Sequence, residues 1–496
     1  MFRHWILKNC GTPLIRHYAK KIENSAYDPY PYQNAALKKI INTCRKTELG
    51  IQCGLSQLKT MDNARTLPAF NYEMLRPEFE KIYQEGKQGF FSWEPIKAIS
   101  LTSGTTGGPK YIPITPSLIN NLVRIGFSLY AGFSNELNNP KELFDGKALY
   151  LSAQPYVYNS PTALPVGFIS GYMNSNRHWL YKDLLYPSTK TLAIPDAQVR
   201  MTRIFEEIKD QDIRMILGFP AIIQLVTAKA LSYFNVSHLQ QLWTNLSVCV
   251  YGGNFLSLSQ IDYLKKSWIG DVSTEKKLLF LEHYSAAEGF FGHTLHSDWP
   301  GLVFNPFDVF YQLKQNRDDF EFLQLHELKE GGRYLIYVTT LAGLINYEME
   351  DIIEITSVKP LTFKFFARAK EQISLISEKI LVSEIKQVVE CLAQALNQPI
   401  HDFAVYLDCR SGNRLFFILS TPIANLDSSI QLLDDSLRKI NPNYNEYRAN
   451  NTYQPPKIIY KPTEFFNKYR EKNIHKGNFK EKRLFMSEAE FNAAYF

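Results

Sequence analysis

The stretch AISLTSGTTGGPKYIPIT, residues 98–115, indicates both the fold and the chemistry of this chain. Apolar residues on either side of a run of Gly, Ser and Thr predict a strand, a turn and a second strand, followed by a helix from about Ser117 to Phe133. The glycines allow backbone N–H groups to approach a ligand closely, and the hydroxyls and Lys110 add donors and a positive charge. This set of groups suits a polyphosphate.

The candidate phosphate loop departs from the Walker A pattern. Pro109 stands where that motif has its second Gly, and Tyr111 stands where it has Ser or Thr. A P-loop also continues directly into a helix, whereas this segment continues as a strand. The alternative interpretation is an ordinary glycine-rich hairpin turn, but the hydroxyls together with a Lys favour phosphate binding. The loop consists of Thr102, Ser103, Gly104, Thr105, Thr106, Gly107, Gly108, Pro109 and Lys110.

Short β-like runs alternate with helical runs from residue 146 to residue 255. Such alternation is typical of an α/β fold with a largely parallel sheet. The runs RYLIYVTT at 333–340 and LINYEMEDIIEI at 344–355 instead indicate antiparallel strands. The sequence therefore predicts an α/β fold with mixed, largely parallel sheets.

The pattern changes after about residue 366. A helix over 381–396, two strands separated by a turn and a further helix predict a small α+β domain. We expect a large domain over residues 1–366 and a small C-terminal domain over residues 371–496, which would act as a mobile lid. The hinge between them is expected at residues 366–370.

Composition places the chain among folded proteins of ordinary charge. Its 496 residues are about three times the roughly 150 of a typical domain, which excludes a single small module. Hydrophobic residues make up 45% and aromatic residues 14%, so the chain can build a core and disorder is disfavoured. A net charge of +6 suits anionic small molecules and is too small to indicate a nucleic acid.

The cysteines and the N-terminus bear on location. The six cysteines form no CxxC pair and are too sparse for a disulfide framework, so we expect reduced thiols in the cytoplasm.

The N-terminus has no acidic residue before Glu23 and could be a transit peptide, which makes organelle import the alternative. We interpret it as a surface helix that packs through Trp5, Ile6 and Leu7. No apolar run reaches the roughly 18 residues of a membrane helix.

Two further segments combine an acidic residue with an aromatic one. YSAAEG at 284–289 follows a buried strand, where Glu288 could bind a metal and Tyr284 could offer a stacking face. In YEMED at 347–351, the carboxylate of Asp351 could accept hydrogen bonds from ribose hydroxyls. Taken alone, each segment is also typical of a solvated turn.

Basic residues and histidines offer weaker signals. Residues 468–483 hold seven Lys or Arg against two Glu, which is typical of a solvated surface or of a Lys delivered to a phosphate. His283, His293 and His296 could suggest a metal site, but the HxxH spacing suits one helical face poorly and no Cys lies nearby. We therefore expect packing or surface histidines.

Taken in order, these motifs resemble the auxin-responsive acyl-acid amido synthetase family, a branch of the adenylate-forming superfamily that includes acyl-CoA ligases and luciferase. The phosphate loop is similar to the family's S-S-G-T-[ST]-x-G-x-x-K motif, with Thr102 where Ser is usual and Lys110 in register. HYSAAEGFFG is similar to the Y-x-[SA]-[SA]-E motif and places Glu288 on its acidic position. EKILVSE at 378–384 and NFKEKR resemble the family's later motifs and put its late Lys at Lys480. The segments TELG and LPAFNYEMLRPEFEKIYQEGKQG, which precede the candidate phosphate loop, resemble the family's sequence in that region.

The resemblance implies an ATP- and Mg²⁺-dependent enzyme. A carboxylic acid would be activated as an acyl-adenylate and then transferred to an amine, typically an amino acid. Lys480, Lys110 and Glu288 would be catalytic, with Glu288 as the Mg²⁺ ligand, Tyr284 stacked on adenine and Asp351 bound to ribose. The implied nucleotide contacts are Thr102, Ser103, Gly104, Thr105, Thr106, Gly107, Gly253, Asn254, Tyr284, Ser285, Ala286, Asp351 and Arg368. The candidate walls of the acyl pocket, with core packing as the alternative, are Gly167, Phe168, Phe219 and Pro220.

One motif departs from the family pattern. The family has Y-R-x-G-D where this chain has YEMED, so Glu348 and Glu350 replace Arg and Gly. Loss of the Gly predicts a different local turn, and two added carboxylates would repel a triphosphate. Lys482 also stands where the tail motif has Pro.

Two alternatives to the amido synthetase remain open at this point. One is an acyl-CoA ligase, and the other is a catalytically weakened protein that binds an adenylate as a sensor or effector. In each case the expected partners are small molecules, without nucleic acid or membrane, and the protein is expected to be a monomer or weak dimer.

Overall fold

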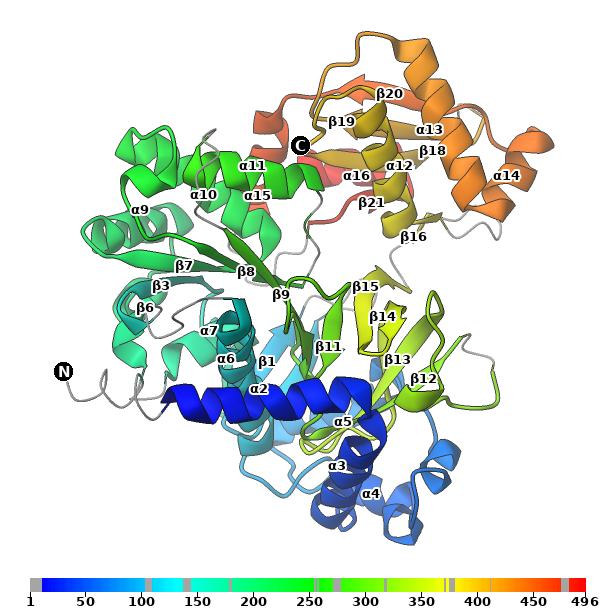
Figure 1. Ribbon diagram of the computed structural model, residues 1–496. Coiled ribbons are helices and arrows are strands. Elements are labelled where there is room, and N and C mark those ends of the chain that lie inside the picture. Colours follow the sequence, from blue (N-terminus) through cyan, green and yellow to red (C-terminus); the bar gives the residue numbers. More distant parts are fainter. Residues whose placement is uncertain are drawn as a thin grey trace.

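The computed structural model describes residues 11–102, 109–136, 144–177, 181–253, 256, 258–270, 278–315, 319–369, 372–373, 380–410, 412–473 and 481–496 (Figure 1). Within these ranges, eleven strands form one mixed sheet. The neighbouring strands from β6 through β3, β7 and β8 to β9 are parallel, and every neighbouring pair from β9 to β12 is antiparallel. This confirms the mixed α/β fold, but the expectation of a largely parallel sheet is wrong. Of the ten neighbouring pairs in this sheet as described, four are parallel and six antiparallel, because the strands from β9 to β12 follow one another through turns and loops and not through α-helices. The strands, in spatial order, are β12 (Val309–Lys314), β13 (Arg333–Thr340), β14 (Tyr347–Val358), β15 (Leu361–Arg368), β11 (Leu302–Phe304), β10 (Gly289–His293), β9 (Leu279–Ala286), β8 (Val248–Gly252), β7 (Ile213–Gly218), β3 (Lys147–Leu151) and β6 (Leu185–Tyr186).

Helices cover both faces of the parallel half, which is why β8 is buried along its whole length. On one face Cys249 packs among residues of α9, α10 and α11. On the other, Val250 packs with Leu129 of α6, and α2 lies along α6. Because helices cover both faces of the sheet at β8, its sequence VCVYG does not alternate between apolar and polar residues. The helices of this part are α2 (Thr12–Tyr27), α6 (Pro116–Glu136), α7 (Ile169–Ser175), α8 (Thr189–Leu192), α9 (Ala197–Ile208), α10 (Pro220–Phe234) and α11 (Leu258–Ile269).

The expected hairpin is present as two antiparallel strands, with Thr102 paired to Lys110. The hydroxyl of Tyr72 accepts the N–H of Tyr111 at 2.9 Å, so α5 holds the second strand beside the turn. The two ends of the candidate phosphate loop therefore lie side by side. The elements of this region are α3 (Pro29–Cys44), α4 (Glu48–Gln52), α5 (Tyr72–Glu85), β1 (Ala98–Thr102), β2 (Lys110–Ile114), β4 (Tyr158–Asn159) and β5 (Pro165–Gly167).

The C-terminal part has its own sheet (Figure 1). It also has its own apolar core. Leu392, Leu407, Phe417 and Leu433 are among the buried residues that join its helices to its strands. This arrangement matches the expected α+β composition, while the boundary at 366–370 stays a prediction. The elements are β16 (Gln372–Ile373), β17 (Ile380–Leu381), α12 (Val382–Ala395), β18 (Phe403–Asp408), β19 (Arg414–Leu419), α13 (Leu426–Ile440), α14 (Pro442–Ala449), β20 (Lys457–Tyr460), α15 (Thr463–Asn473), β21 (Leu484–Phe485) and α16 (Glu488–Tyr495).

The C-terminal part rests on α10 of the large sheet's helical layer. Ala221 of α10 belongs to the same apolar cluster as Phe466 of α15 and Phe491 of α16. At the rim, Lys229 and Glu471 form an ion pair of 2.8 Å. Within the described ranges, none of the helices combines the length and apolar character needed to cross a bilayer.

A buried ionic cluster ties the C-terminal part together. The guanidinium of Arg470, only 1% exposed, donates to both carboxylate oxygens of Asp402 and to Glu481 at 3.0 Å. Burial alone would raise the pKa of Asp402, but the adjacent guanidinium outweighs burial and lowers that pKa. The stabilisation from the pair is therefore present at neutral pH and is lost as the pH falls through the lowered pKa.

We expect Arg470→Met to lower the free energy of unfolding by about 3 kcal/mol, because the buried carboxylates of Asp402 and Glu481 lose their closest counter-charge and keep only Arg483, at 3.9 Å and 2.9 Å. Urea unfolding at neutral pH measures this change. Lys20→Met is the control, since the pair of Lys20 with Glu23 is exposed at the surface and should contribute less than about 1 kcal/mol. Equal losses in the two variants would contradict this role of Arg470.

Candidate active site

A cavity of about 840 Å³ opens where the hairpin, the large sheet and α6 meet. It is within the size range of small-molecule sites. Segments far apart in the sequence share it: β8, β9 with the turn that follows it, and β14 all contribute lining residues. The predicted site residues that line it are Thr102, Lys110, Phe219, Gly253, Tyr284, Ser285, Ala286, Glu288, Asp351 and Arg368.

Seven predicted site residues lie outside the described ranges. These are Ser103, Gly104, Thr105, Thr106, Gly107, Asn254 and Lys480. The flanking residues Thr102, Lys110 and Gly253 are described and line the cavity. The roles predicted for the seven therefore stay predictions.

Glu288 lies in the tight turn between β9 and β10. One of its carboxylate oxygens, Oε1, accepts the hydroxyl of Tyr347 at 3.3 Å. The turn is anchored from outside the sheet, because Oδ1 of Asn121 on α6 accepts the N–H of Phe290 at 2.7 Å. Burial raises the pKa of Glu288, and the positive charge of Lys110 opposes this effect without cancelling it. The ionised carboxylate is therefore incompletely compensated by the described side chains.

Asp351 lies beside Arg368 in the register of β14 and β15. The hydroxyl of Tyr284 donates to Oδ2 of Asp351 at 2.6 Å, and Nε of Arg368 lies 3.8 Å from Oδ1. Burial raises the pKa of Asp351, and Arg368 and Tyr284 lower it only in part. The sheet thus holds a second buried carboxylate in the same cavity.

The ring of Tyr284 is enclosed rather than free. It is 6% exposed and has the rings of Phe291, Phe363 and Phe365 around it, with centroids 5.4 to 6.2 Å away. Its established contact is the hydrogen bond to Asp351. Stacking of adenine on Tyr284 stays a prediction.

Of the two carboxylates that the YEMED motif adds to the family pattern, one faces the cavity and the other does not. Glu350 lines the cavity and pairs with Nζ of Lys110 at 3.4 Å. Glu348 does not line it, because its carboxylate accepts the hydroxyl of Tyr337 at 3.2 Å among other buried side chains. Glu350, at the position of the family's Gly, has φ of 60°, the left-handed conformation that Gly adopts most easily. A side chain there is strained by roughly 1–3 kcal/mol. A local turn different from that of the family stays a prediction.

Three predicted walls of the acyl pocket are absent from the described lining of the cavity. Gly167 packs so closely on the chain that an added Cβ would lie 1.9 Å from the carbonyl oxygen of Pro155. Phe168 and Pro220 begin helices and are buried in the core. Phe219 does line the cavity. The alternative interpretation, packing in the core, therefore applies to Gly167, Phe168 and Pro220.

Sequence analysis missed several residues of the cavity. His283 lines the cavity, and its Nδ1 forms a hydrogen bond with the hydroxyl of Ser285 at 3.0 Å. Burial lowers the pKa of His283 to about 4, so its imidazole is neutral at pH 7. Glu282 also lines the cavity, and burial raises its pKa to about 7. Both residues directly precede the YSAAEG motif, and this position in the sequence is the signal that could have identified them. Among the described residues, no cluster of three metal-ligating side chains is present.

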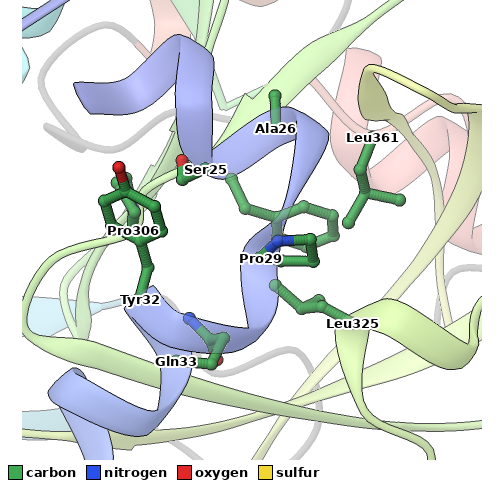
Figure 2. A pocket seen from close by; sticks show the side chains of 9 residues that line it. Ser25, Ala26, Pro29, Tyr32, Gln33, Pro306, Leu325 and Leu361 are labelled. Atoms are coloured by element: carbon green, nitrogen blue, oxygen red, sulfur yellow. The ribbon is translucent and has the colours of Figure 1, made fainter. Parts of the chain in front are cut away.

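A second hollow is too small to be a site for a substrate. It lies between α2, α3 and the residues around Phe304, and its volume is about 10 Å³ (Figure 2). Ser25, Pro29, Gln33 and Leu361 are among the side chains around it. Such a volume has room for about one water molecule.

Comparison with solved structures defines the class of fold. A 2-hydroxyisobutyryl-CoA ligase in complex with 2-HIB-AMP matches 93% of this chain and 93% of its own, with a TM-score of 0.60 and 14% identity. A GH3.15 acyl acid amido synthetase in complex with 2,4-DB matches 97% of this chain and 96% of its own, with a TM-score of 0.78 and 16% identity. The protein has the fold of the adenylate-forming enzymes.

Comparison with family models then assigns the family. Residues 18–217 match the GH3 family N-terminal domain, residues 304–368 its central domain and residues 383–488 its C-terminal domain. The chain belongs to the GH3 family, which confirms the resemblance carried by the motifs. The probable indole-3-acetic acid-amido synthetase GH3.1 of Arabidopsis thaliana is 23% identical over 472 residues, 80% of this chain and 78% of the relative. The jasmonoyl–L-amino acid synthetase JAR4 of Nicotiana attenuata is 23% identical over 440 residues, 74% of each chain.

We expect Tyr284→Phe to lower the free energy of unfolding by about 1–3 kcal/mol, because the buried carboxylate of Asp351 loses a hydrogen-bond donor. Urea unfolding measures the change. Tyr233→Phe is the control, since that side chain is 49% exposed. If Tyr284→Phe were as stable as the parent, the hydrogen bond would not be holding Asp351.

Proposed function

We propose that this protein is an ATP-dependent acyl-acid amido synthetase. The observation that carries the proposal is a single cavity shared by the two ends of the phosphate loop, by Glu288 and by Asp351. Membership of the GH3 family supports it, as do the names of relatives that join indole-3-acetic acid or jasmonate to amino acids. The expected substrates are ATP, a carboxylic acid and an amine such as an amino acid.

In the first half-reaction a carboxylate oxygen of the acid attacks the α-phosphorus of ATP. A new O–P bond forms, the bond to the β-phosphate oxygen breaks, and pyrophosphate leaves with that electron pair. Catalysis of such a displacement depends on positioning and on charge neutralisation. Lys110 and the backbone of residues 102–110 would hold the β- and γ-phosphates, and Asp351 and Arg368 would contact the ribose end.

The residues around Glu288 suit a magnesium ion. Mg²⁺ prefers oxygen ligands and is commonly held by one or two carboxylates together with substrate phosphates. The buried Glu288 carboxylate has a raised pKa, so a divalent cation would supply the charge compensation that the described side chains leave incomplete. Bound there, Mg²⁺ would neutralise charge on the phosphate oxygens.

In the second half-reaction the amine attacks the acyl carbon, the acyl–O bond to AMP breaks and an amide forms, with loss of a proton from the amine. The C-terminal part bears Lys480, which we propose reaches the α-phosphate when that part closes over the cavity. Closure would also exclude water, which competes with the amine for the acyl-adenylate.

Two alternatives are tested by the same assays. An acyl-CoA ligase would share the first half-reaction and use a thiol as the acceptor. A weakened adenylate-binding protein is favoured by one observation. Glu350 pairs with Lys110, the cation that we propose binds the phosphates.

We also propose a cytoplasmic location. It is supported by the free cysteines among the described residues, which are Cys44, Cys53, Cys249, Cys391 and Cys409.

The deciding experiment is acid-dependent exchange of pyrophosphate into ATP, measured across a panel of aliphatic and aromatic acids. Exchange with at least one acid, followed by amide formation when amino acids are added, supports the synthetase. Thioester formation with coenzyme A and no amide would assign the ligase. Nucleotide binding without exchange for any acid would assign the sensor.

We expect Lys480→Ala to slow acid-dependent exchange about a hundredfold, since removal of one charge aimed at a transition state typically costs about 3 kcal/mol. ATP binding, measured by calorimetry, should persist. Lys482→Ala is the control, because Lys482 lies nearby in the sequence and pairs at the surface with Glu490. A similar exchange rate in Lys480→Ala and in the parent would contradict this role.

Nucleotide binding in the presence of Mg²⁺ should depend on the ionisation of Glu288. Since burial raises the pKa of Glu288, its carboxylate stays protonated to a higher pH than an ordinary Glu, and affinity for Mg·ATP should rise with pH through that raised pKa. We expect Glu288→Gln to weaken Mg·ATP binding and to remove this pH dependence. Glu348→Gln is the control, because Glu348 is a buried carboxylate that does not line the cavity. This variant should keep the pH dependence of the parent. Calorimetric titrations at several pH values provide the test.

A further inference from the structure

The cavity continues beyond its charged end as an apolar arm. We use this name for the part lined by Leu122, Ile125, Gly126 and Leu129 of α6, Met173 of α7 and Met215 of β7. The charged residues of the described lining lie on β2, β9 and its turn, β14 or β15, and none of them lies on α6, α7 or β7. The arm therefore suits the apolar part of a ligand that also carries a charged group.

The arm is long because α6 forms one side of it over several turns. At one end, Asn121 is bonded to the turn that carries Glu288. Gly126 lies five residues farther along α6 and Tyr130 nine, which correspond to about 7.5 Å and about 13.5 Å along the helix axis. At the far end Tyr130 lines the cavity and stacks on Phe144, with ring centroids 4.7 Å apart.

Gly126 keeps the middle of this arm open. Glycine is among the least favourable residues in the interior of a helix, and α6 runs from Pro116 to Glu136 around it. A Cβ added to Gly126 would meet no atom within 4 Å, so neither the backbone nor a close neighbour requires Gly there. Gly126 lines the cavity, and a larger side chain would extend into open space.

We propose that the apolar arm binds the tail of a long, unbranched aliphatic monocarboxylic acid, with Gly126 leaving room for the chain to pass. The proposal rests on the proposed function, because the carboxyl group must lie at the charged end beside Glu288 and Lys110 for the tail to enter the arm. A compact aromatic acid would fill only the part of the arm nearest that end.

The first test is a series of straight-chain acids from acetate through hexanoate and decanoate to tetradecanoate. We expect kcat/KM for acid-dependent pyrophosphate exchange to rise about fourfold per added methylene until the arm is filled, since each buried methylene contributes a constant transfer free energy. Indole-3-acetate and benzoate should be poorer substrates than decanoate. A flat series would overturn the proposal.

The second test changes the arm itself. Gly126→Leu should lower the ratio of kcat/KM for decanoate to that for hexanoate at least tenfold. Gly126→Ala adds a single methyl group at the same position and should lower the ratio less. Thermal unfolding shows whether both variants are folded, and if Gly126→Leu is not, the smaller shift in Gly126→Ala decides the question. An unchanged ratio in both variants would overturn the proposal.

A binding measurement separates this proposal from the proposed function. Displacement of dansyl-undecanoate by decanoate reports on the arm without any catalysis. Binding that Gly126→Leu abolishes, together with no exchange for any acid, would support the arm and overturn the synthetase. Exchange with aromatic or short acids, together with no binding of the probe, would support the synthetase and overturn the arm.

Discussion

The burial of two carboxylates in one cavity is the constraint on which the rest of the site depends. Glu288 and Asp351 come from segments separated by about sixty residues, and each receives a tyrosine hydroxyl, from Tyr347 and Tyr284. Burial near another negative charge disfavours ionisation, and both pKa values are accordingly raised. The antiparallel half of the sheet is needed because it brings β9, β14 and β15 together. A cavity built in this way favours a ligand that arrives with cationic compensation.

Lys110 links this acidic centre to the hairpin. In the structure its Nζ pairs with Glu350, and both side chains are mostly buried. A phosphate that binds Lys110 must therefore replace an existing partner, and the net gain is the difference between two ion pairs. Glu350 is also held at a strained, left-handed φ. If Lys110 binds a phosphate as proposed, Glu350 at the position of the family's Gly competes with that phosphate for the same cation.

The features that were predictable from sequence are those set by local residues. The hairpin of residues 98–115 follows from its Gly-rich centre and apolar flanks, and the buried β8 follows from its apolar run. The directions of Glu348 and Glu350 were not predictable, because they depend on a positive φ and on register shifts in β14 that change which face a side chain occupies. Of the four predicted pocket walls, Phe219 lines the cavity and Gly167, Phe168 and Pro220 do not. Sequence could not separate them, because apolar residues that line a cavity have the same pattern as residues that fill a core. Only the packing around α6 distinguishes them.

Asn121 connects the two ends of the cavity. Its side chain fixes α6 to the turn that carries Glu288, so the helix beside the apolar arm and the carboxylate at the charged end cannot move independently. Asn121 is buried, and breaking its hydrogen bond would leave the N–H of Phe290 without this acceptor. A ligand that fills the arm and presses on α6 therefore acts on the position of Glu288. If the arm binds the acid and the turn positions the phosphates, as proposed, the two events are coupled through this hydrogen bond and through the packing of α6 on β9 and β10.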